Sequence, residues 1–155
     1  MEISSGEQAE EIIGWYARRW TIEELHRILK TGCKIEERQL DSFEKLSLVL
    51  VLDLIVASNI LGLTKAARTQ PEQPATEWLE PDQCQALYCY IHRTNDLPPE
   101  PLSLKDAVNW IARLGGLLNL KGDGFPGAQV LWQGLRRLDD ITEVFRIFRN
   151  QEICG

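Results

Sequence analysis

The sequence predicts a mainly α-helical protein, arranged as a multi-helical orthogonal bundle. Apolar residues recur at intervals of three and four along most of the chain, and no stretch alternates at two as a strand would. The chain has 155 residues, of which 44% are apolar and five are Trp, so it is long and apolar enough to bury a core. These observations place it among globular proteins and away from disordered chains.

Three helices are expected in the first half of the chain. The first spans Gly6 to Arg19, and a second begins at Thr21, where Thr21 and Glu24 have the spacing of a capping box. Gly32 is expected to end that second helix. The third and longest helix is expected over 42–68. It is apolar over most of its circumference, which favours a role as the central core helix.

The second half divides at loops rich in proline and glycine. Loops are expected over 69–82 and 94–102, each with three prolines, and a short helix over 84–92 lies between them. Ser103 is expected to cap a helix that runs to about residue 118. The segment GDGFPG at 122–127 then separates it from a last helix ending near residue 150.

Composition limits the possible functions and locations. A formal net charge of -6 argues against a small autonomous nucleic-acid binder with an overall basic field. The four cysteines lack the spacing of a zinc site or a disulfide framework, so we expect reduced thiols in a cytoplasmic protein. No signal peptide is expected, because residues 1–11 carry four Glu and no apolar run. Asp53, Ser58 and Asn59 interrupt its longest apolar run, 46–63, so a core helix is expected there rather than a membrane span.

The stretch WYARRWTIEELHRILKTG, residues 15–32, mixes aromatic, basic and acidic side chains. On a helical wheel, its residues Tyr16, Arg19, Glu23 and Lys30 fall on one stripe about 60° wide. The opposite side should meet the core and carries Ile22, Leu25, Ile28 and Leu29. A solvated face with an i,i+4 ion pair between Arg19 and Glu23 is one explanation of the polar stripe.

The spacing of these four polar residues points to a second explanation. Tyr16-x2-Arg19-x3-Glu23-x6-Lys30 resembles the Y-R-E-K signature of bacterial DDE transposases of the insertion-sequence-four family, and in particular those of the Tn-five type. The surrounding residues are similar as well, and so is the later segment 112–116, Ala-Arg-Leu-Gly-Gly. The resemblance covers most of the chain.

The resemblance implies a role for each residue of the motif. Glu23 corresponds to the third carboxylate of the DDE triad, which with two aspartates holds two Mg²⁺ or Mn²⁺ ions for DNA strand cleavage and transfer. Tyr16, Arg19 and Lys30 correspond to residues that hold phosphates of the transposon-end DNA. The family's two aspartates lie upstream, on an RNase H-like sheet. This chain is expected to lack most or all of that sheet. A lone Glu is not expected to bind metal tightly or to catalyse alone.

The chain is therefore expected to be the C-terminal third of a transposase. Residues 1–40 would end the catalytic domain, and 41–155 would form a helical dimerisation domain. A homodimer is expected, or a heterodimer with intact transposase that inhibits transposition. The apolar stripe expected to dimerise consists of Leu131, Leu135, Leu138, Phe145 and Phe148. Two alternatives stay open: the stripe packs on its own domain, or the chain is a helical protein-interaction domain with an inert ancestral site.

Overall fold

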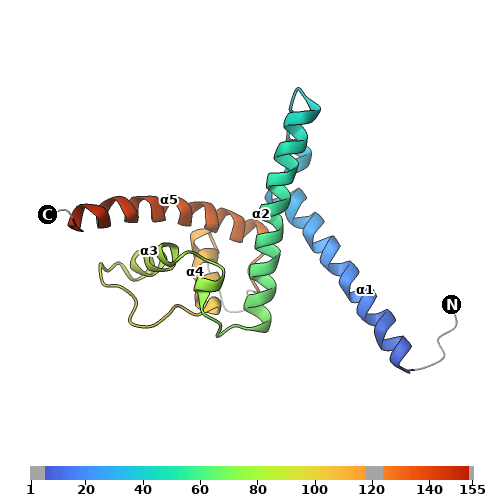
Figure 1. Cartoon of the computed structure of the whole chain (residues 1–155), viewed down its shortest axis with the longest axis horizontal. Coiled ribbons are helices and arrows are strands. Elements are labelled where there is room, and N and C mark those ends of the chain that lie inside the picture. Colours follow the sequence, from blue (N-terminus) through green and yellow to red (C-terminus); the bar gives the residue numbers. More distant parts are fainter. Residues whose placement is uncertain (1–5, 118–123, 154–155) are drawn as a thin grey trace. The chain divides into compact units, whose positions relative to one another are not determined.

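Figure 1 shows the computed structural model of the chain, which describes residues 6–117 and 124–153. Across these residues the structure is helical, and the one β-type pairing is an isolated bridge between Pro74 and Ser103. The predicted mainly α-helical class without a sheet is therefore confirmed. The elements in chain order are α1 (Gly6–Arg27), η1 (Ile28–Gly32), η2 (Ile35–Glu37), α2 (Phe43–Thr69), η3 (Ala75–Glu77), α3 (Pro81–His92), α4 (Leu104–Leu114) and α5 (Ala128–Ile153).

The chain forms two compact units. Unit 1 is Met1–Leu61 and unit 2 is Gly62–Gly155, so the division falls inside α2.

In unit 1, α1 is one unbroken helix of 22 residues, and the predicted break before Thr21 is wrong. Neither Gly nor Pro stands between residues 15 and 31, so the i→i−4 hydrogen bonds continue through Thr21 and no cap is required there. After Arg27 the chain widens into the π-helix η1. That turn ends at Gly32, where the sequence predicts a stop, and Lys34 follows in the left-handed conformation with φ 54°.

The core face predicted on this segment is right only in its last turn. Ile28 and Leu29 are buried, whereas Ile22 is 56% exposed. Trp15 and Trp20 are also exposed. The first turns of α1 thus present apolar side chains to solvent.

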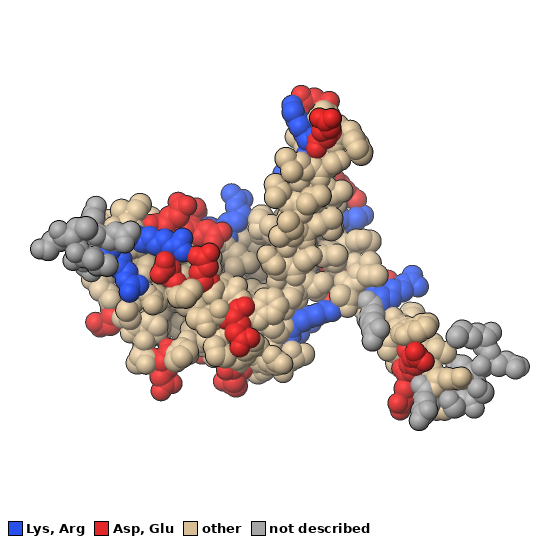
Figure 2. Space-filling model, viewed as in Figure 1, with Lys and Arg blue, Asp and Glu red and all other residues tan. Residues whose placement is uncertain are grey.

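The bounds of α2 agree with the prediction to within one residue, but its first two thirds are not a core helix. Leu46, Leu50 and Leu54 are 42%, 40% and 36% exposed. Figure 2 shows the visible face of α2 as a mainly uncharged surface. The neighbouring segment 33–38 contacts α2 at Asp53, and a segment of that length cannot cover a helix that is apolar on most sides.

Among the described residues, α2 is also the one helix long and apolar enough to cross a membrane. Of its most apolar window, 28% is buried. A single helix of this kind is a weak indication, because core helices of soluble proteins meet the same two conditions.

In unit 2, α5 packs along both α3 and α4, and α3 packs against α4 (Figure 1). Ser103 caps α4 as predicted, because its hydroxyl oxygen accepts a hydrogen bond from the Asp106 backbone N–H at 3.2 Å. The fully buried side chains at the centre of this unit come from all three helices and include Leu87, Leu104, Val108, Ile111, Leu131 and Leu138.

Two glycines bring the backbones of α4 and α5 together. A Cβ at Gly134 would lie 1.9 Å from the Ile111 carbonyl oxygen, and one at Gly115 would lie 1.9 Å from the Val130 carbonyl oxygen. Only glycine fits at either position. The helix α4 ends at Leu114, earlier than the predicted residue 118, because Gly115 and Gly116 follow and Gly116 has a φ of +99°.

Candidate functional site

Tyr16, Arg19 and Glu23 share one face of α1 because the helix is continuous from Gly6 to Arg27. Arg19 Nε lies 3.7 Å from Glu23 Oε1, which is the i,i+4 ion pair that the wheel predicts. The side chains of Arg19 and Glu23 are 72% and 50% exposed, and Tyr16 is exposed as well. All three can therefore be reached by a ligand in solution.

Lys30 belongs to the π-helix and has a different partner. Its Nζ lies 2.8 Å from Glu36 Oε1, and both side chains are exposed. The adjoining Thr31 hydroxyl donates a hydrogen bond to the Arg27 carbonyl oxygen at 2.7 Å. The structure thus brings Arg19 and Glu23 together, and it pairs Lys30 with Glu36, a carboxylate outside the Y-R-E-K motif. Each of the two cations has an exposed carboxylate partner, and such pairs are weak enough to be exchanged for a phosphate.

A buried ion pair fixes the segment after Lys30 onto α2. Arg38 Nη2 donates to Asp53 Oδ1 at 2.9 Å, and the Asp53 side chain is buried. The Cys33 thiol lies 3.8 Å from the Asp53 carbonyl oxygen. Burial raises the pKa of that thiol, and the Asp53 carboxylate raises it further. In the sequence, Asp53 interrupts an apolar run, and a carboxylate within such a run is itself a signal of a buried partner.

The described residues do not form a metal centre. Nowhere in residues 6–117 and 124–153 do three or more His, Cys, Asp or Glu side chains gather as ligands. Glu23 is half exposed and has Arg19 as its recorded partner. A divalent cation with oxygen ligands requires several convergent carboxylates, so any site at Glu23 needs ligands from elsewhere.

The five residues expected to dimerise have different environments along α5. Leu131 and Leu138 are fully buried and belong to the core of unit 2. Leu135 and Phe145 are partly buried, and Phe148 is 64% exposed. A partner can reach the C-terminal members of this set, whereas the first and third are covered by their own unit.

The helix has a second apolar face that is open. At 100° per residue, Val144, Ile147 and Phe148 point about 130°, 170° and 90° away from the mean direction of the buried Leu131 and Leu138. All three are more than half exposed. We call these three residues the outer stripe of α5.

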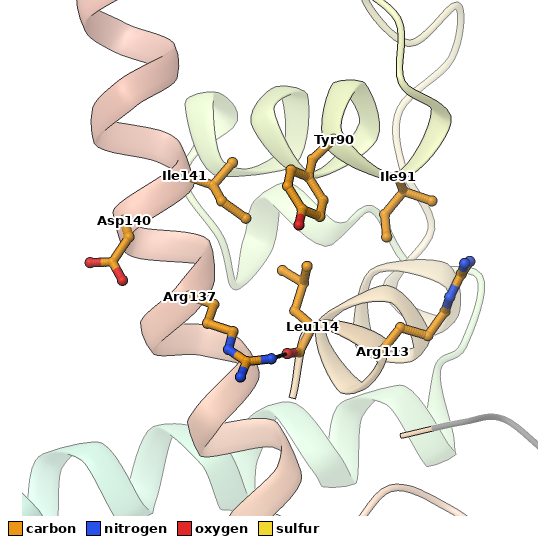
Figure 3. A pocket seen from close by; sticks show the side chains of 7 residues that line it. All are labelled: Tyr90, Ile91, Arg113, Leu114, Arg137, Asp140 and Ile141. Atoms are coloured by element: carbon orange, nitrogen blue, oxygen red, sulfur yellow. Dashed lines mark hydrogen bonds between the residues drawn. The ribbon is translucent and has the colours of Figure 1, made fainter. Parts of the chain in front are cut away.

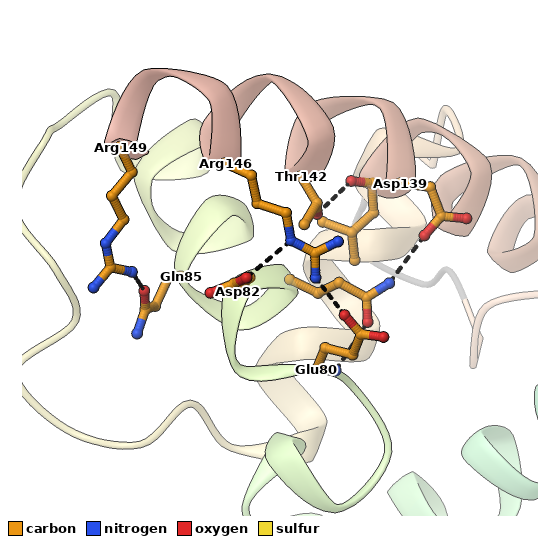
Figure 4. Close-up of polar contacts among 9 residues, drawn as sticks. Glu80, Asp82, Gln85, Asp139, Thr142, Arg146 and Arg149 are labelled. Atoms are coloured by element: carbon orange, nitrogen blue, oxygen red, sulfur yellow. Dashed lines mark hydrogen bonds and ion pairs between the residues drawn. The ribbon is translucent and has the colours of Figure 1, made fainter. Parts of the chain in front are cut away.

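Polar contacts hold the inner side of α5 against α3 (Figure 4). Arg146 Nε donates to Asp82 at 2.8 Å, and its Nη2 donates to Glu80. Gln83 Nε2 donates to Asp139 at 2.9 Å. Burial raises the pKa of Asp139, as do nearby carboxylates, while the Gln83 bond lowers it.

Between the helices of unit 2 lies an open pocket of about 410 Å³ (Figure 3). Arg113 and Arg137 lie on either side of Leu114, and Tyr90 and Ile141 form the opposite wall. The guanidinium Nη1 of Arg137 donates a hydrogen bond to the Leu114 carbonyl oxygen at the end of α4. The nearby His92 packs between Tyr88 and Trp110, with ring centroids at 4.4 and 5.1 Å, which is an aromatic environment rather than a metal site.

Comparison with known protein families gives two matches. Residues 3–59 match the transposase DDE domain, which in the complete enzyme implies divalent metal ions. Residues 55–155 match the Tn5 transposase dimerisation domain, and this match covers most of the chain. The two matches meet within α2, in the same helix that crosses from unit 1 to unit 2. The chain therefore belongs to the family of Tn5 transposase dimerisation domains and carries a segment of a transposase DDE domain before it.

Proposed function

We propose that this chain acts as the C-terminal part of a cut-and-paste transposase, in the cytoplasm, and joins protomers through the outer stripe of α5. The observation that carries the proposal is the exposure of Val144, Ile147 and Phe148, which point away from Leu131 and Leu138 in the packed core. Three large apolar side chains on one exposed face are typical of an interaction site. The occupant is a second protomer, because the segment belongs to a dimerisation domain.

A symmetric pair of chains uses the same stripe twice, so one substitution changes both halves of the interface. Phe148→Asp or Val144→Asp should convert a dimer to a monomer with unchanged helix content, measured by sedimentation equilibrium and circular dichroism. Leu131→Ala is the matched control. It removes buried apolar volume from the same helix, so it should lower thermal stability and leave the dimer intact below the melting temperature. A dimer that survives Phe148→Asp and Val144→Asp, or a monomeric wild type, would contradict the proposal.

The proposal includes mixed dimers of this chain with an intact transposase, and such dimers would inhibit transposition. Adding the wild-type chain to an intact relative should lower the transposition frequency. The Phe148→Asp variant should have no effect at the same concentration. Equal inhibition by the two proteins would show that inhibition does not depend on this interface.

In unit 1 we propose the roles that the Y-R-E-K resemblance implies. Glu23 would supply the third catalytic carboxylate, with Tyr16, Arg19 and Lys30 contacting DNA phosphates. Support comes from the shared exposed face of Tyr16, Arg19 and Glu23 and from the weak ion pairs that a phosphate can displace. The apolar residues of α1 and α2 that are exposed here support the proposal that unit 1 is normally covered by the rest of a catalytic domain. That remaining part would carry the two aspartates. We also propose that the division between the two domains falls between residues 40 and 41.

The DNA contacts can be tested without catalysis. Lys30→Gln should weaken binding of duplex DNA uniformly across sequences and reduce the salt dependence of log K by about one. Lys45→Gln is the matched control, because Lys45 is likewise an exposed lysine of unit 1 paired with a carboxylate, Asp41 at 3.2 Å. Equal effects of the two substitutions would assign the loss to net charge. An absence of DNA binding at low salt would favour the inert interaction domain instead.

A further inference from the structure

Four arginines of unit 2 line one continuous cleft. The pocket of Figure 3 shares Tyr90 and Arg113 with a neighbouring hollow that Arg93 also lines. On its other side it shares Arg137 and Asp140 with a hollow lined by Arg136. We call this continuous surface the arginine cleft. It is formed by the ends of α3 and α4 and the middle of α5.

The guanidinium groups of this cleft are not neutralised. Arg93, Arg113, Arg136 and Arg137 are all exposed, and among the described residues none of them forms an ion pair with a carboxylate. Asp140 is the one acidic residue on the walls of these three hollows. By contrast, Arg146 on the same α5 is fully engaged with Glu80 and Asp82. The cleft therefore concentrates positive charge in a protein whose net charge is -6.

The backbone at Arg93 places this residue at the end of α3, on the rim of the cleft. Arg93 ends α3 with φ 53° and ψ 47°, the left-handed conformation that glycine adopts most easily. This conformation is a common way for a helix to end, and the backbone N–H groups of Arg93 and Thr94 both donate to the Cys89 carbonyl oxygen. The Arg93 side chain lines the cleft beside Tyr90 and Arg113. The helix dipoles favour cations at the ends of α3 and α4, but they do not require an arginine in this conformation.

We propose that the arginine cleft binds the phosphate backbone of DNA, as a contact separate from the Y-R-E-K residues of unit 1. Exposed guanidiniums without carboxylate partners suit phosphate oxygens, to which arginine can donate two parallel hydrogen bonds. The Tyr90 hydroxyl points into the pocket toward Leu114 and adds a neutral donor (Figure 3). Such contacts position a duplex without reading its sequence. The inference rests on the proposed function in one respect, namely that DNA is a partner of this chain.

The test uses the full chain and a labelled duplex of arbitrary sequence, with fluorescence anisotropy over a series of salt concentrations. Arg113→Gln is the cleanest variant, because it breaks no ion pair recorded in the structure. It should weaken binding about fivefold to tenfold near 0.1 M salt and lower the salt dependence of log K by about one. Arg93→Gln should act in the same way and add to Arg113→Gln unless both contact one phosphate.

Lys105→Gln is the matched control, because Lys105 is an exposed cation of the same α4 that lines none of the three hollows. Equal changes for Lys105→Gln and Arg113→Gln would overturn the proposal, as would no DNA binding at low salt. A weaker dimer with unchanged DNA affinity in Arg113→Gln would assign the cleft to an acidic segment of a second protomer and also overturn it. Loss of DNA affinity in Lys30→Gln alone would reject the cleft while leaving the proposed function intact.

Discussion

The two units of this chain differ in whether their large apolar side chains are buried or exposed. In unit 2 the large apolar side chains of α4 point inward, and Val108 and Ile111 are fully buried against the neighbouring helices. In unit 1 the side chains of Trp15, Trp20 and Phe43 are exposed, as is most of the first two thirds of α2. This difference indicates that unit 2 has its own core, whereas unit 1 is held together by a few local contacts. This matches a dimerisation domain joined to a segment of a larger catalytic domain.

The largest expected effect is that of Gly134→Ala in unit 2, and Gly14→Ala is the same substitution in unit 1. Gly134→Ala places a methyl group 1.9 Å from the Ile111 carbonyl oxygen, so α4 and α5 must separate. We expect a loss of about 3 kcal/mol in the free energy of unfolding of unit 2. Gly14→Ala meets nothing within 4 Å and lies inside α1, so it should stabilise that helix by up to about 1 kcal/mol.

Both variants can be measured by urea unfolding monitored by circular dichroism. Opposite signs for the same chemical change would confirm that close packing holds unit 2 and that α1 has free space around it. A tolerated Gly134→Ala would show that the crossing of α4 and α5 is looser than the structure indicates, and the comparison of the two units would lose its basis.

An intermediate effect is expected from breaking the buried ion pair of unit 1. Arg38→Ala leaves the Asp53 carboxylate buried without a partner, and Asp53 Oδ2 has none even in the intact protein. We expect a loss of about 2 kcal/mol, because Arg38 is itself partly exposed and the pair is not fully desolvated. Asp53→Asn removes the buried charge and frees Arg38 to reach water, so it should cost less than Arg38→Ala.

Cysteine alkylation gives a readout for each unit separately. Loss of Arg38 removes a cation that lowers the pKa of the Cys33 thiol, but it also loosens the segment that buries this thiol. Local opening should have the larger effect, so Cys33 should react faster in Arg38→Ala than in the wild type. Cys84 in unit 2 is the internal control, because it is buried and burial raises its pKa to about 11. Faster alkylation of Cys33 with no change at Cys84 would localise the effect to unit 1. Parallel changes at both thiols would show that the two units unfold together.

The sequence predicted those features that depend on local pattern. The bounds of α2, the cap at Ser103 and the stop at Gly32 follow from apolar spacing, side-chain hydrogen bonding and glycine. The predicted start of a helix at Thr21 was wrong, because inside a continuous helix the backbone hydrogen bonds are already made and a capping side chain is not needed. The core role of α2 was wrong because apolar composition does not say what is available to cover a helix.

The candidate site was predictable to a similar degree. The wheel places Arg19 beside Glu23, and the structure has that ion pair. The partner of Lys30 was not predictable, since the π-helix at Ile28–Gly32 changes the rotation per residue and brings Lys30 to Glu36. The buried and exposed faces of α5 were also hidden, because apolar residues occur on both sides of that helix and only packing separates Leu138 from Phe148.

The smallest expected effect concerns Asp139, and it tests whether unit 2 tolerates charge at the edge of its core. Burial raises the pKa of Asp139 in the folded state, so its ionised form is destabilising at neutral pH. Asp139→Asn keeps an acceptor for Gln83 and should stabilise unit 2 by about 0.5 kcal/mol at pH 7, a value kept low by solvent screening. The advantage should shrink as the pH falls through the folded pKa and vanish below the ordinary Asp value, because the wild-type carboxyl is then neutral in both states. Asp140→Asn removes the same charge one residue along α5 without touching the Gln83 bond, and it should stabilise less. A gain that persists at low pH would assign the effect to helix propensity or packing and not to the charge of the Asp139 carboxylate.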